Sequence, residues 1–126
     1  MTQTFGSFIR QKRKEKMYRL NSFAKQVGIS NVYLSYIESG KRPAPSQAIM
    51  QKMADVLELN AEEYANMKYL ASLSRSRFSI PENVMKYLSD RPYVFKSLLL
   101  AAENELDEDA WREIDSFIRH RIYQPK

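Results

Sequence analysis

Cysteine is absent from the 126 residues, and histidine occurs only once. Without cysteine the chain can form no disulfide and no thiolate metal or redox site, which suits a reducing compartment, so we expect a cytoplasmic protein. His120 alone cannot form a catalytic triad or a multi-histidine metal site. Its neighbours Arg119 and Arg121 indicate an exposed position on a helix. We therefore expect no metal, no cofactor and no catalytic residue.

Long apolar runs are also scarce. The longest, Leu98–Ala102, is far shorter than the roughly 20 residues of a membrane-spanning helix. The N-terminus lacks the apolar segment of a signal peptide. Gly40 and Lys41 lack the other residues of a phosphate-binding loop, and the acidic run 103–109 lacks the glycine and spacing of a calcium loop. These absences argue against a membrane protein and against an enzyme.

Strand signals are missing as well, because no segment alternates apolar and polar residues. The 3 glycines and 5 prolines stand at positions that suit helix ends. The pattern predicts an all-α protein with a five-helix domain in residues 1–74, a linker at 75–79 and a helical region of about three helices in 80–126. Helices are expected to start near Thr4, Arg19, Ser30, Ser46, Asn60, Ser79, Asp90 and Asp107.

Positive charge is concentrated in the first half of the chain. Residues 1–60 contain ten lysines and arginines and four acids, an excess of six positive charges, whereas the remainder carries a net charge of −1. A basic half joined to a nearly neutral half is typical of a nucleic-acid-binding domain attached to a region with another role. A solvated basic face is the other interpretation of the same charges.

The most informative segment is residues 19–38, which has the pattern of two short helices joined by a tight turn. Gly28 ends the first helix where a left-handed cap residue is needed, and Ser30 is a suitable N-cap for the second. The apolar residues at helical spacing are Phe23, Ala24, Val27, Leu34 and Ile37. This arrangement predicts a helix-turn-helix, which places its second helix in the DNA major groove.

Extended outward, the pattern resembles the XRE (Cro/lambda-repressor-like) family of helix-turn-helix regulators over about residues 4–60. The matching positions are Ile9, Arg10, Arg13, Phe23, Ala24, Val27, Gly28, Ile29, Ser30, Tyr33 to Gly40, Lys41, Arg42, Pro43, Pro45, Ser46, Met53, Ala54, Val56 and Leu57. The resemblance implies a sequence-specific transcriptional regulator. It further implies a repressor that binds a pseudo-palindromic operator as a homodimer, through recognition helix 31–39.

Phe5, Ile9 and Met17 define an apolar face on the first predicted helix. Arg13 lies on the same face, where a charge needs a partner. Members of the family pair this arginine with the glutamate that ends the recognition helix, so the resemblance implies a structural ion pair between Arg13 and Glu38. Spacing also places Glu38 beside the buried stripe of its own helix.

The start and exposed face of the recognition helix are expected to read bases. The candidates are Asn31, Val32, Tyr33 and Tyr36. Asn31 suits a bidentate contact to adenine and Val32 a thymine methyl, whereas the tyrosines have packing as their other interpretation. Expected contacts to the DNA backbone are Arg10, Arg19, Asn21, Lys25, Ser35, Lys41 and Arg42. Many family members carry a phosphate-binding glutamine where this chain has Leu20, which cannot make that contact.

The C-terminal helices are short and amphipathic, so they bury little by themselves. We expect them to join two copies of the chain, with an intramolecular extension of the core as the alternative. The candidate partners are double-stranded DNA, a second copy, and a regulatory protein such as a protease, an anti-repressor or a toxin. Two other functions stay open: an antitoxin that regulates its own promoter and binds a toxin through the C-terminal region, and an interaction adaptor without DNA binding.

Overall fold

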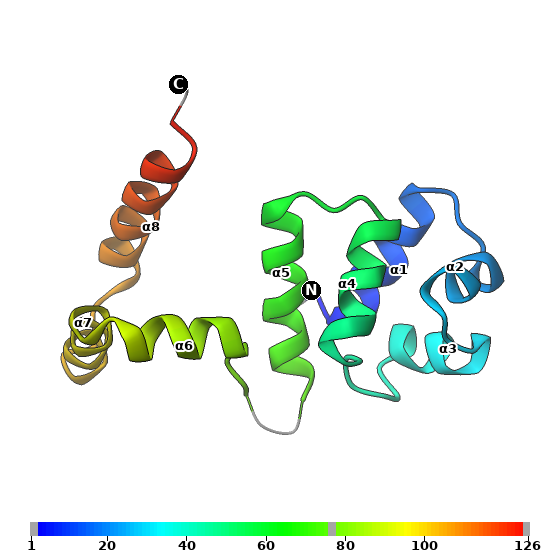
Figure 1. Cartoon of the computed structure of the whole chain (residues 1–126), viewed down its shortest axis with the longest axis horizontal. Helices are drawn as coiled ribbons and strands as arrows, with labels where there is room; N and C mark the ends of the chain where they lie inside the picture. Colours follow the sequence, from blue (N-terminus) through cyan, green and yellow to red (C-terminus); the bar gives the residue numbers. More distant parts are fainter. Residues whose placement is uncertain (1–2, 76–77, 125–126) are drawn as a thin grey trace. The chain divides into compact units, whose positions relative to one another are not determined.

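The computed structural model describes residues 3–75 and 78–124, and these contain eight α-helices and no strand (Figure 1). The all-α fold predicted from the sequence is therefore confirmed. The helices are α1 (Phe5–Glu15), α2 (Leu20–Val27), α3 (Asn31–Ser39), α4 (Gln47–Val56), α5 (Ala61–Ser74), α6 (Glu82–Asp90), α7 (Pro92–Glu103) and α8 (Glu108–Ile122). Residues 76 and 77 of the expected linker lie outside the described residues.

The chain divides into two compact units, Met1–Pro81 and Glu82–Lys126. The first unit, called the N-terminal unit below, contains α1 to α5, coloured blue to green in Figure 1. The second, called the C-terminal unit, contains α6 to α8. No helix in the described part of the chain is long and apolar enough to cross a membrane.

The N-terminal unit is built around one apolar core. Helix α1 packs against α3 and α5, and α2 packs against α3 and α4. Four core residues, each from a different helix, are 0% exposed: Ile9, Phe23, Leu34 and Met53. Burying such side chains is the main favourable term in folding, so this unit has the means to fold by itself.

Local signals place the ends of these helices. The hydroxyl of Ser30 accepts a hydrogen bond from the Tyr33 backbone N–H at the start of α3, as the N-cap pattern predicts. Asn60 and Glu63 form the predicted capping box at the start of α5. Gly28 has φ +87°, the left-handed conformation that only glycine adopts freely, and ends α2.

Helices α1 and α3 approach each other closely at Gly6, which the sequence pattern did not single out. A Cβ atom at Gly6 would lie 2.4 Å from the carbonyl oxygen of Ile37 and 2.5 Å from that of Glu38. Both obstacles are backbone atoms of α3, so they cannot move aside as a flexible side chain would. Gly6 therefore fixes how closely α1 supports the end of the recognition helix.

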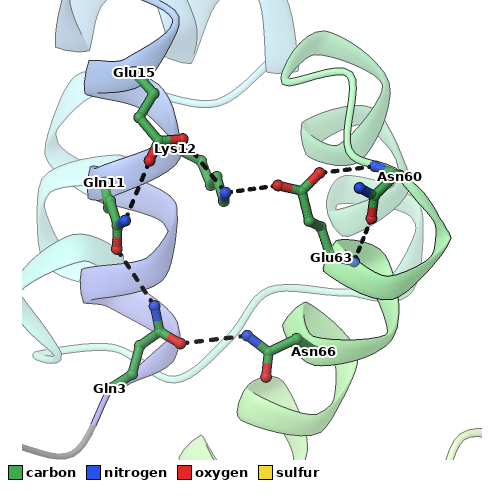
Figure 2. A network of polar contacts seen from close by, with 7 residues as sticks. All are labelled: Gln3, Gln11, Lys12, Glu15, Asn60, Glu63 and Asn66. Carbon is green, nitrogen blue, oxygen red and sulfur yellow. Dashed lines mark hydrogen bonds and ion pairs between the residues drawn. The ribbon is translucent and has the colours of Figure 1, made fainter.

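A polar network ties α1 to α5 on the surface of the N-terminal unit (Figure 2). Lys12 Nζ donates to Glu63 at 2.6 Å, and Glu63 also accepts from the Asn60 backbone N–H at 3.0 Å. At the other end, Asn66 donates to Gln3 at 3.3 Å. The Asn60 hydrogen bond first, and then Lys12, lower the pKa of Glu63, while the hydrogen bond to Glu63 raises the pKa of Lys12. The network therefore holds both groups in their charged forms.

Two details of the sequence interpretation were wrong. Met17 does not belong to the apolar face of α1, because the helix ends at Glu15. The backbone at Met17 has a positive φ of 60°, and its side chain is 89% exposed. Phe8 is buried on α1 instead. The sixth helix does not start near Ser79, since α6 begins at Glu82, after Pro81.

The C-terminal unit has well-formed helices but no interior. Pro92 stands in the first turn of α7, and Asp107 caps α8 by accepting a hydrogen bond from the Ala110 backbone N–H at 2.8 Å. None of the residues in α6, α7 or α8 is buried. Large apolar side chains stand in solvent, with Leu100 61% and Phe117 64% exposed. The local sequence thus specifies helices that lack an apolar partner.

Candidate nucleic-acid interface

Arg13 and Glu38 join α1 to the last turn of the recognition helix α3. Arg13 Nε donates to Glu38 Oε2 at 2.8 Å and a terminal nitrogen donates to Oε1 at 3.0 Å, which is a bidentate pair. The remaining terminal nitrogen donates to the Tyr18 carbonyl at 2.9 Å. The two charged side chains are only 11% and 7% exposed, so the predicted ion pair is confirmed and lies within the scaffold.

The recognition helix has one buried face and one open face. Leu34 and Ile37 point into the core and are at most 1% exposed. Val32 is 61% exposed, and Asn31 and Ser35 are also exposed. Because Asn31 and Val32 start the helix, they stand where a recognition helix contacts base edges. The fold therefore leaves the expected reading positions free while it fixes the axis of the helix.

The two tyrosines of α3 have different surroundings. Tyr33 is partly buried and packs against the core cluster, so part of its ring serves as packing. Tyr36 is 39% exposed, and the Lys41 ammonium lies 5.4 Å from the centre of its ring. The backbone N–H of Lys41 also donates to the Tyr36 carbonyl at 2.9 Å. Tyr36 is thus accessible and lies next to a cation.

All of the residues expected to contact the DNA backbone are exposed. They are Arg10 on α1, Arg19, Asn21 and Lys25 at the start or end of α2, Ser35 on α3, and Lys41 and Arg42 in the loop after α3. Arg19 is the N-cap residue of α2, but its side chain makes no capping hydrogen bond. Leu20 packs against the core, so its side chain serves the fold.

Two further cations lie close to these positions, although the sequence pattern gave them no role. Arg75 lines a surface hollow of about 580 Å³ together with Lys41 and Arg42, and it also donates to the Pro45 carbonyl at 3.1 Å. Lys52 lies on α4 with its ammonium 3.8 Å from where a Cβ of Gly28 would stand. Both are far from the helix-turn-helix in sequence, so only the packing of α4 and α5 brings them near.

Comparison with known proteins supports this description of the N-terminal unit. The helix-turn-helix family matches residues 9–64. The chain is 48% identical over 63 residues to the uncharacterized HTH-type transcriptional regulator YazB of Bacillus subtilis, covering 50% of this chain and 90% of YazB. It is 34% identical over 64 residues to the HTH-type transcriptional regulator SinR of Bacillus subtilis, covering 51% of this chain and 58% of SinR.

Among solved structures, the N-terminal DNA binding domain of SinR from Bacillus subtilis is similar, with a TM-score of 0.44 and 34% identity over 48% of this chain and 88% of that one. The matched part of the chain spans little more than half the length of SinR. The helix-turn-helix family match, residues 9–64, lies within the N-terminal unit. The sequence similarity to YazB, over nearly its whole length, confirms the family that the sequence pattern indicated. The chain belongs to the XRE (Cro/lambda-repressor-like) family of helix-turn-helix transcriptional regulators.

Proposed function

We propose that this regulator is a repressor that binds a pseudo-palindromic operator as a homodimer. In this proposal α3 enters the major groove, and the helices of the C-terminal unit hold two copies together. The observation that carries the proposal is the open face of α3. Asn31, Val32 and Tyr36 are exposed on it, while Leu34 and Ile37 anchor the opposite face in the core.

The charges around α3 support the same mode of binding. Lys25 in the last turn of α2, and Lys41 and Arg42 after α3, are exposed on either side of α3 in sequence. Cations that neutralise phosphates release bound counterions, which supplies affinity on any sequence and makes binding steeply salt-dependent. Base contacts from α3 then supply the sequence preference.

Two copies are needed because one helix-turn-helix reads only a half-site. Dimers of this class read two half-sites about one helical turn of DNA apart. The C-terminal unit is suited to join the copies, since its apolar side chains lack an interior to pack into. A homodimer would bury this surface and impose two-fold symmetry on the operator.

Selection of bound sequences from a random pool of duplex DNA, using the full chain, tests the proposal. The expected product is an inverted repeat with a fixed half-site spacing. An Asn31→Ala variant should lose preference at one base pair of each half-site, at a cost of about 1–3 kcal/mol there. An Arg42→Gln variant is the matched comparison, because loss of a phosphate contact should weaken all sequences alike and reduce the salt slope by about one.

Three outcomes would contradict parts of this proposal. An unchanged sequence preference in Asn31→Ala removes Asn31 from base reading. A selected site without internal symmetry argues against the homodimer. A reporter promoter that becomes more active when the selected operator and the protein are both present would show an activator in place of a repressor.

A further inference from the structure

Helix α8 carries an apolar stripe that the described part of the C-terminal unit leaves partly exposed. Its members recur at intervals of three and four residues, so they share one face of the helix. They are Trp111 at 36% exposure, Ile114 at 37%, Phe117 at 64%, Ile118 at 49% and Ile122 at 66%. The exposure rises toward the C-terminal end, so the second half of α8 is the most open part of the stripe.

Each end of this stripe carries one charge of opposite sign. Arg121 follows Ile114 by seven residues and Phe117 by four, which places it on the apolar face. Its guanidinium lies 5.7 Å from the centre of the Phe117 ring, and in the described part of the chain it forms no ion pair. Asp107, the N-cap, precedes Ile114 by seven residues and therefore starts the same face. A covered Arg121 needs a carboxylate beside it.

We propose that α8 pairs with α8 of a second copy of this chain in antiparallel orientation. This inference rests on the homodimer proposed above and specifies its seam. With Ile114 on the two-fold axis, Arg121 of each copy meets Asp107 of the other, because the two residues stand equally far from Ile114. A parallel pair would instead place Arg121 against Arg121 and Asp107 against Asp107.

The charges beside the stripe favour the same orientation. Glu108, Arg112, Asp115 and Arg119 all border one edge of the stripe. Within the helix, Arg112 lies 4.0 Å from Glu108, and Arg119 lies 2.8 Å from Asp115. In the antiparallel pair this edge lies beside the same edge of the other copy. Glu108 then stands within one residue of the position opposite Arg119 of the other copy, and Arg112 within one residue of the position opposite Asp115. A parallel pair turns the two copies of this edge to opposite sides, so these attractions are not available to it.

The size of the facing side chains agrees with this register. Residues at equal distances on opposite sides of Ile114 face each other, so Ala110 stands opposite Ile118 of the second copy. Trp111 stands opposite Phe117 in the same way. A small residue opposite a branched one, followed by two aromatic rings, fills a seam without overlap.

Single cysteines test the orientation directly, because the natural chain has none. In the full chain, Ile114→Cys should form a disulfide-linked dimer under mild oxidation, since both copies of residue 114 lie at the axis. Ile122→Cys is the matched control, with the same substitution on the same stripe. Its two copies would stand 16 residues apart along the seam, about 24 Å, too far for a disulfide.

Sedimentation of the unmodified chain separates this inference from the homodimer itself. Cross-linking at residue 114 and not at 122 supports the antiparallel seam. Cross-linking at both positions, or at 122 alone, overturns it. A dimer in sedimentation that cross-links at neither position also overturns the seam, but leaves the homodimer in place. A monomer at all concentrations overturns both.

Neutralising the two end charges provides a second measurement. Asp107→Asn keeps an efficient N-cap while it removes the charge, and Arg121→Gln removes the opposite charge. At low salt each variant should weaken the dimer about tenfold, because two symmetric pairs are lost. The double variant should weaken it no further, as expected for partners. Lys96→Gln on α7 should have no effect, and effects of the two end variants that multiply would overturn the pairing.

Discussion

The two units of this chain are made of similar helices with similar caps, yet only one of them has an interior. In the N-terminal unit the apolar faces of five helices meet in one core, which includes Phe23, Leu34 and Met67. In the C-terminal unit the apolar faces of α7 and α8 stay open to solvent. Helix signals in the sequence are therefore not enough to predict a folded domain, because burial depends on where the helices converge.

The largest difference between the two units is expected in how the stability of their helices changes when the protein is diluted. Helices of 9, 12 and 15 residues are marginal in water without packing, so α6, α7 and α8 should depend on the second copy. Hydrogen exchange on the full chain checks this. While the dimer predominates, exchange in these helices should accelerate about threefold for each tenfold dilution, by mass action.

Amides of α1 to α5 provide the internal reference for that experiment. Their core is complete within one copy, so their exchange should not change with concentration. If all eight helices respond alike, the two units do not differ as the burial suggests. If none responds, the C-terminal unit is stable as a monomer.

Within the N-terminal unit the largest effect is expected from the buried ion pair. Arg13→Ala leaves Glu38 buried and unpaired, at a cost of about 3–5 kcal/mol. Thermal unfolding followed by circular dichroism should show the loss before any change in operator preference. Lys14→Ala, an exposed charge on the same helix, is the control and should leave the midpoint nearly unchanged. An unaltered melting temperature in Arg13→Ala would remove the pair from the scaffold.

Gly6 on α1 and Gly40, the C-cap of α3, offer a matched pair of substitutions near the end of α3. Gly6→Ala places a methyl group against two backbone carbonyls and should cost about 3 kcal/mol. Gly40→Ala has open space but φ +83°, so it should cost only about 1 kcal/mol of conformational strain. Chemical denaturation measures both. Equal losses would show that the approach at Gly6 relaxes easily.

The smallest effect on stability is expected when the pH is lowered into the acid range. The pKa of Glu63 is lowered in the folded chain, so its contribution is present above the unfolded value near 4.5 and is lost as the pH falls through the lower folded value. The raised pKa of Lys12 matters only above about pH 10.5, so the acid side reports on Glu63 alone.

Glu63→Gln isolates this term, because glutamine can still complete the capping box. The variant should be less stable than the natural chain by about 0.5–1 kcal/mol at pH 7, and the difference should shrink below pH 4.5. Asp55→Asn removes an exposed carboxylate that accepts a hydrogen bond from Gln51 within the same helix, and it is the control for the loss of a surface carboxylate. A constant difference across the acid range would mean that the ion pair adds nothing to stability.

Local residue patterns predicted much of the fold and the place of the site. Gly28, Ser30 and the box formed by Asn60 and Glu63 act within a few residues, so the sequence reveals them directly. The same holds for the two faces of α3, which follow from helical spacing. Contacts to bases stay a prediction, because the exposure of a side chain on α3 does not specify which base pair it contacts.

Other features could not be predicted from spacing. Gly6 looks like an ordinary helix residue until α3 lies across it, and Arg75 looks like part of a linker until it lines the hollow beside Lys41. Met17 fits the period of α1, but the chain turns away before reaching it. In each case the outcome depends on a neighbour distant in sequence or on where a helix stops.

The sequence by itself determined the all-α class, the helix-turn-helix and its family, because these follow from local spacing and capping. The tertiary structure decided which apolar faces are buried. It brought Gly6 under α3 and left much of the stripe of α8 exposed, whereas the pair of Arg13 and Glu38 confirmed what the sequence had already indicated. The physical reason is that burial requires two surfaces in contact. The periodicity of one helix predicts which of its faces is apolar, but not which other helix covers that face.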